Sequence, residues 1–193
     1  MLRRLYDWTM GLAARRNAMS VLALISFIES SIFPIPPDVL IVPMVLARRD
    51  RAFRIAAVAT IASVVGGLAG YAIGALLYET VGVWIIEAYG AAEQFAEFRT
   101  AFRDWGWWLV VMGGFTPFPY KVITIASGVA ELDLATFVMA SLVSRGARFY
   151  LEAWLLWRFG APIRGFIEGN LAWLSAAFFA LLVAGFLAIK YLF

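Results

Sequence analysis

Six charged residues interrupt segments of this sequence that otherwise hold almost no charge. Arg145 and Arg148 lie three residues apart in SRGARFYLE, so a helix would place both guanidinium groups on one face. Two arginines on one face can bind the oxygens of an anion, phosphate above all, through bidentate hydrogen bonds. Carboxylates near them could serve as countercharges or carry a proton. The predicted pathway residues are Glu29, Asp38, Lys121, Arg145, Arg148 and Glu152.

Prolines break the chain beside three of these charges. The run ESSIFPIPPDVLIVP covers 29–43 and the run FTPFPYKVIT covers 115–124. Proline lacks an N–H donor and restricts the residue before it, so a helix cannot continue through either run. The predicted tips of the two breaks are Pro34, Pro36, Pro37, Pro117 and Pro119.

The composition indicates whether these elements lie in a membrane or in water. The 193 residues are 63% hydrophobic and 15% charged, whereas a soluble domain carries about a quarter charged residues. We therefore expect an all-α integral membrane protein with a single domain, 1–193. The absence of histidine and cysteine removes the commonest metal ligands and the usual general base. We expect no metal, no cofactor and no enzymatic activity.

Three segments have the length of a membrane span. The segments 55–78 and 171–190 are almost free of charge, and 134–157 is long enough but contains Arg145, Arg148 and Glu152. Ionisable groups inside a span are costly and face a cavity or a partner. At the N-terminus, 2–16 alternates arginines with apolar residues, which predicts an amphipathic helix on the membrane surface.

The two proline breaks predict re-entrant hairpins over 17–47 and 106–130. Each apolar arm is too short to cross a bilayer, and irregular backbone at membrane depth must be buried in protein or line a wet cavity. For 17–47 the alternative is one long span kinked at Pro34. Arginines lie on both sides of 17–47, which places both its ends in the cytoplasm and favours the hairpin.

The pattern of hairpin followed by span occurs twice. Acidic residues flank 106–130, which suits the outer face, so the two hairpins would enter from opposite sides. Inverted repeats with broken helices are typical of secondary transporters. The predicted fold is an inverted repeat of re-entrant hairpin plus transmembrane helix, with an N-terminal amphipathic helix and an extra C-terminal span.

Several motifs together resemble the DedA family, also called the VTT-domain or SNARE-associated family, and its YqaA-like branch in particular. They are Glu29 with its proline tip, the GGxxGYxxG pattern of the first span, GGFTPFPYKVITIASG at 113–128 and SRGARF at 144–149. The resemblance covers 18–160. It implies two inward-facing hairpins and transport of phospholipids or of undecaprenyl phosphate, with dependence on the proton motive force. Glu29 matches the family's acidic residue before the first tip, and Lys121 stands where many members have an arginine.

The predicted function is a membrane transporter, a flippase or scramblase of a phosphate-bearing lipid, with proton coupling left open. The partners would be a membrane lipid with an anionic head group and protons, without nucleic acid; a homo-oligomer is left open. The expected location is a bacterial inner membrane, multi-pass, with the N-terminus in the cytoplasm. Two alternatives remain: a proton- or cation-coupled transporter of a soluble solute, and a scaffold in which the charges only lock the fold.

Overall fold

The fold was analysed in a computed structural model that describes residues 17–32, 36–88, 90, 92–116, 118–160 and 162. Within these ranges the secondary structure is helical and contains no strand. The predicted amphipathic helix 2–16, the tip residues Pro34 and Pro117, and the predicted span 171–190 lie outside them.

The described helices follow one another with short connections. A last helix, residues 134–160, follows α7. The others are α2 (Ala18–Ser31), α3 (Asp38–Ala47), the 3-10 turn η1 (Arg49–Arg51), α4 (Ala52–Leu77), the π-helical turn η2 (Tyr78–Gly82), α5 (Val83–Ala88), α6 (Ala92–Phe115) and α7 (Tyr120–Val129).

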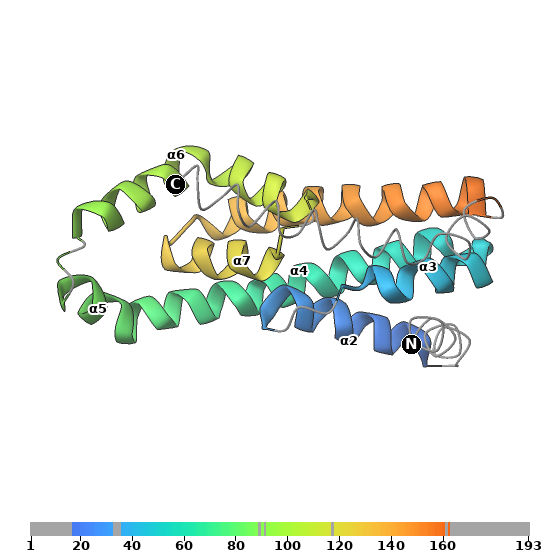
Figure 1. Cartoon of the computed structure of the whole chain (residues 1–193), viewed down its shortest axis with the longest axis horizontal. Helices are drawn as coiled ribbons and strands as arrows, with labels where there is room; N and C mark the ends of the chain where they lie inside the picture. The colour runs from blue at the N-terminus through green and yellow to red at the C-terminus, as the bar shows by residue number, and fades with distance from the viewer. Residues whose placement is uncertain are drawn as a thin grey trace.

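The helices form an elongated bundle around α4 (Figure 1). From one end of the bundle α2 runs to the middle, and α3 runs back towards that end. From the other end α6 runs to the middle and α7 returns. The end of α2 and the start of α7 therefore lie near the middle of the molecule, where Thr124 of α7 donates a hydrogen bond to the carbonyl of Ser30 in α2.

Helix lengths separate α4 from its neighbours. The helical segment Arg49–Thr80 is long and apolar enough to cross a membrane by length and composition. The apolar helices α2, α3 and α7 are shorter; at 14 residues α2 extends about 21 Å, less than the roughly 30 Å of a bilayer core.

The helix α6 is longer than the predicted short arm, which was expected to begin at Gly106. It begins at Ala92. Its additional turns carry Phe95, Phe98 and Phe102 at helical spacing, and these rings contact one another in sequence while Phe95 stacks on Tyr78. These aromatic contacts stabilise the first turns of α6. The sequence did not predict these turns, because charged residues interrupt their apolar pattern.

Glycines allow the neighbours of α4 to approach its backbone. A Cβ atom at Gly66 would lie 2.2 Å from the carbonyl oxygen of Phe27 in α2, and one at Gly74 would lie 2.0 Å from that of Ile125 in α7. On α7, a Cβ atom at Gly128 would lie 2.0 Å from the carbonyl oxygen of Tyr71. The small residues of GGLAGYAIG thus bring both broken helix pairs against α4.

Gly74→Ala is expected to destabilise the protein strongly, because the obstructing atom is backbone and cannot rotate away. Overpacking of this kind costs about 1–3 kcal/mol or more. Gly146→Ala is the matched control, since its Cβ would lie 3.8 Å from the nearest atom, a Thr60 methyl. Thermal unfolding in detergent should show a lowered midpoint for Gly74→Ala alone; equal midpoints would contradict this packing.

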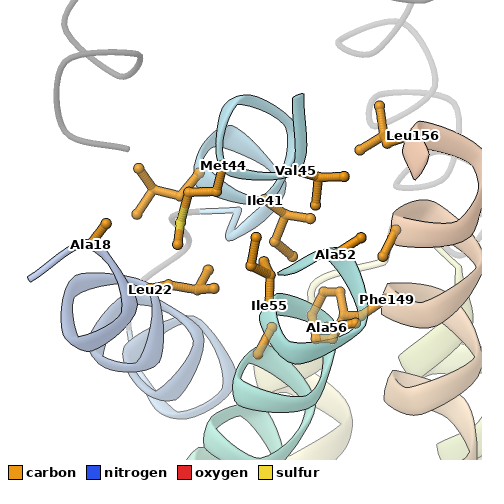
Figure 2. Close-up of a cluster of buried hydrophobic side chains, with 13 residues drawn as sticks. Ala18, Leu22, Ile41, Met44, Val45, Ala52, Ile55, Ala56, Phe149 and Leu156 are labelled. Atoms are coloured by element: carbon orange, nitrogen blue, oxygen red, sulfur yellow. The ribbon is translucent and has the colours of Figure 1, made fainter. Parts of the chain in front are cut away.

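One apolar cluster joins α2, α3, the start of α4 and the helix 134–160 (Figure 2). Leu22, Ile41, Ile55 and Phe149 are central members and are almost fully buried. In Figure 2 the ring of Phe149, from the last helix, points towards Ala56 of α4, and Leu156 lies on the side of Val45 in α3. The cluster fixes the last helix, which carries three of the predicted pathway residues, against the first helix pair.

The helix 134–160 begins with a capping residue. Asp133 Oδ2 accepts hydrogen bonds from the backbone N–H of Thr136, at 2.8 Å, and from its hydroxyl, at 2.9 Å. These hydrogen bonds to the charged form lower the pKa of Asp133 below its usual value. The stabilisation by this cap is therefore present above the ordinary aspartate pKa and is lost as the pH falls through the lowered one.

Candidate functional site

Arg145 is enclosed in the middle of the bundle. Its side chain is 2% exposed. Nη2 donates to Glu29 Oε2 at 2.7 Å, Nε donates to Ser63 Oγ at 2.7 Å, and Nη1 donates to the carbonyl of Gly114 at 3.4 Å. Such a guanidinium group has little freedom to exchange its partners.

Aromatic rings enclose the same guanidinium group. Its central carbon lies 4.8 Å from the centre of the Tyr120 ring and 4.6 Å from that of Phe149. Tyr120 is itself buried and donates its hydroxyl proton to Ser141. Cation–π contacts with two rings add to the ion pair with Glu29, so Arg145 joins α2, α4, α6 and α7 to its own helix.

Arg148, one helical turn later, lies in a more open position. Its Nη2 donates to both carboxylate oxygens of Asp38, at 3.1 and 3.3 Å, and its Nη1 donates to the carbonyl of Thr116 at 2.9 Å. The side chains of Arg148 and Asp38 are 22% and 31% exposed. This ion pair connects the start of α3 with the end of α6 and remains accessible from outside the protein.

Glu152 completes the charged group on the last helix. Glu152 lies one helical turn after Arg148 on the same face of the helix, and therefore beside the Arg148–Asp38 pair. The Glu152 Oε2 atom is buried and has no hydrogen-bond partner among the described residues. We call the following set the charge cluster: Glu29, Asp38, Arg145, Arg148 and Glu152.

Hydroxyl groups extend the charge cluster between the helix pairs. Ser30 Oγ lies 2.6 Å from Ser63 Oγ and donates to the carbonyl of Ser26 at 3.0 Å. The same hydroxyl lies 3.1 Å from Glu29 Oε2. Ser63 therefore connects Arg145 to the C-terminal turn of α2, and Thr124 Oγ1 reaches the carbonyl of Ser30 from α7 at 3.1 Å.

Lys121 lies apart from the charge cluster. Its Nζ donates to the carbonyl of Ile32 at 3.1 Å, at the C-terminal end of α2. A cation at this position satisfies a free carbonyl and the partial negative charge of the helix end. Lys121 thus connects the tips of the two helix pairs.

The structure brings five of the six predicted pathway residues together. They form the ion pairs Arg145–Glu29 and Arg148–Asp38, and Glu152 lies beside the second pair. Whether they form a pathway stays a prediction. Sequence reasoning missed Ser63, Tyr120 and Phe149, which surround Arg145. A serine in an otherwise apolar span was the available signal for Ser63, whereas nothing in the sequence distinguishes these two aromatic residues from the many others.

No group of three or more metal-ligating side chains occurs within the described residues. The polar groups of the site are instead guanidinium, carboxylate and hydroxyl groups. Such groups bind anions and exchange protons.

The chain is similar to a known protein family and to proteins of two bacteria. The VTT domain family matches residues 35–158. An uncharacterized protein of Haemophilus influenzae is 41% identical over 169 residues, which is 85% of this chain and 87% of that protein. One of Histophilus somni is 36% identical over 168 residues, with 85% of this chain and 87% of that protein covered. No solved structure gives a significant match.

The chain is a membrane protein whose described residues fold into helices, and it belongs to the VTT-domain (DedA) family. The resemblance on the sequence motifs is thereby confirmed. The family is a membrane family regarded as transporter-like.

Proposed function

We propose that this protein moves a phosphate-bearing lipid across the membrane and that the Arg148–Asp38 pair handles its head group. The observation that carries the proposal is the difference between the two arginines. Arg145 is 2% exposed and enclosed by fixed partners, whereas Arg148 is 22% exposed and its partner Asp38 is 31% exposed. A phosphate can take the place of Asp38 because its oxygens accept hydrogen bonds from the same Nη2 group that donates to both oxygens of Asp38.

The surroundings of Arg148 support an anionic ligand. The helix α3 begins at Asp38, so the positive end of its dipole lies beside the pair. When a phosphate displaces Asp38 from Arg148, the dipole stabilises the phosphate too. The candidates are a phospholipid and undecaprenyl phosphate, which share this head-group chemistry.

The finer architecture that we propose is an inverted repeat. In it, α2–α3 and α6–α7 are re-entrant hairpins that enter from opposite faces of a bacterial inner membrane, with the N-terminus in the cytoplasm. The return of each pair to the end from which it came supports this arrangement (Figure 1). The meeting of the tips through Lys121, Thr124 and Arg148 supports it as well.

The outer surface of the bundle suits lipid. Large apolar side chains are exposed along its length, where water would make them costly. Examples are Leu24, Ile61, Leu76, Trp105, Met112 and Met139. A lipid that leaves the bilayer towards Arg148 would keep its acyl chains against such a surface.

One observation favours a second candidate, the scaffold. Both arginines of the charge cluster have carboxylate partners, as a purely structural network would require. A scaffold predicts that neutralising an ion pair without disturbing the fold leaves all activity unchanged.

The proposal is tested with purified protein in liposomes. A fluorescent phospholipid and a fluorescent polyprenyl phosphate are followed side by side, with and without a pH gradient. We expect one or both lipids to cross faster than in protein-free liposomes. If neither lipid moves while the protein remains folded, the lipid proposal is wrong, and uptake of soluble anions in the same liposomes then tests the solute transporter.

A further inference from the structure

The charge cluster holds an odd number of charges. Three carboxyl groups, from Glu29, Asp38 and Glu152, face two guanidinium groups, from Arg145 and Arg148. The nearby Lys121 does not correct the imbalance, because it is directed at the carbonyl of Ile32. With every carboxyl ionised, the cluster would carry one uncompensated negative charge at the centre of the bundle.

The geometry shows which carboxyl is in excess. Glu29 is paired with Arg145 at 2.7 Å, and both oxygens of Asp38 accept from Arg148. Glu152 has no such partner, and its Oε2 is buried without a hydrogen bond in the described part of the chain. An ionised carboxylate left in this condition is costly, and a neutral one is not.

Apolar side chains also lie on the helix face that carries Glu152. Phe149 lies three residues before it and Leu156 four residues after it, so all three side chains lie on one face. Phe149, Ala153 and Leu156 belong to the apolar cluster of Figure 2. The charged groups that face Glu152 are Asp38 from α3 and Arg148 and Arg145 from its own helix. Glu29 of α2 is engaged by Arg145.

We propose that Glu152 and Asp38 share one proton and form a proton-binding site. The Glu152 carboxylic acid donates its hydrogen to an Asp38 oxygen, and Asp38 keeps its contact with Arg148. Two neighbouring carboxyl groups that share one hydrogen avoid the repulsion of two adjacent negative charges. With this proton the cluster has two positive and two negative charges and is neutral.

The site connects protonation with access to Arg148. If an anion takes the place of Asp38 at Arg148, it adds a negative charge, and the cluster stays neutral by taking up a second proton, so that Asp38 and Glu152 are both protonated. When the anion leaves, Asp38 returns to Arg148, the second proton is released, and one proton is shared again. This consequence rests on the proposed function, whereas the protonated carboxyl itself does not.

The experiment is infrared spectroscopy of the purified protein in lipid vesicles at neutral pH. A protonated carboxyl group shows a carbonyl stretch well separated from the carboxylate bands, and this band shifts when glutamate is labelled with 13C at the side-chain carboxyl. We expect a band equivalent to one group per chain. It should vanish in Glu152→Gln, which leaves two carboxylates with two guanidinium groups, and remain in the control Glu97→Gln, an exposed glutamate on α6.

Asp38→Asn provides a second variant, because it also leaves equal charges and should remove the band. A wild-type spectrum without the band would overturn the proposal, as would a band that survives Glu152→Gln. These spectra require no transport, so their failure is distinguishable from failure of the liposome experiment.

Discussion

Arg148→Ala is expected to lower the rate of lipid translocation by about 10- to 100-fold, which corresponds to the loss of hydrogen bonds to a charged group. The protein should still fold, since Arg148 is partly exposed and its partner Asp38 can be hydrated or protonated when the guanidinium group is absent. The measurement is the initial translocation rate in liposomes that contain equal amounts of folded protein.

Arg158→Ala is the control for this substitution. Arg158 lies on the same helix but is exposed and stacks on Phe159. Its removal should leave the translocation rate unchanged. Equal rates for Arg148→Ala and wild type would contradict a role of Arg148 in binding the head group.

Arg145→Leu is expected to prevent stable folding rather than to change the transport rate alone. Removal of the guanidinium group leaves Glu29 without its ion partner, and breaking a buried ion pair from one side costs about 3–5 kcal/mol. The substitution also removes the contacts with Tyr120 and Phe149. The midpoint temperature of thermal unfolding and the yield of monodisperse protein should both fall well below the wild-type values.

A double substitution separates the lost charge from the lost packing. Arg145→Met with Glu29→Gln removes both charges and keeps side chains of similar length. It should regain a substantial part of the stability lost in Arg145→Leu, because no charge is then buried without its partner. If the double variant is no more stable than Arg145→Leu, the ion pair does not dominate the role of Arg145.

The apolar runs were sufficient to place α4 and the last helix, and the prolines were sufficient to separate α2 from α3 and α6 from α7. These signals are local, and so they are readable from the chain. The start of α6 at Ala92 could not be predicted from the sequence, because this part of the helix depends on rings that contact Tyr78 across a turn. The close approach of α7 to Gly74 is likewise a tertiary contact that small-residue spacing only suggests.

For the site, the scarcity of charge in apolar segments identified the members of the charge cluster before their arrangement was known. The difference in exposure between the two arginines could not be predicted from the sequence. Arg145 and Arg148 are equivalent by spacing, and only the three-dimensional positions of Ser63, Tyr120 and Phe149 make one enclosed and the other accessible. The isolation of Glu152 Oε2 depends on the whole packing of its surroundings in the same way.

The central claim is that the Arg148–Asp38 pair handles a lipid phosphate and does not merely hold the fold. Its most direct test is the translocation rate of the double variant Asp38→Asn with Arg148→Gln, which removes both charges with little change of shape. Arg99→Gln with Glu131→Gln removes the ion pair between α6 and the turn after α7 and serves as the matched control. We predict that the first variant folds and loses translocation while the second retains it; a folded first variant with the wild-type rate would contradict the claim.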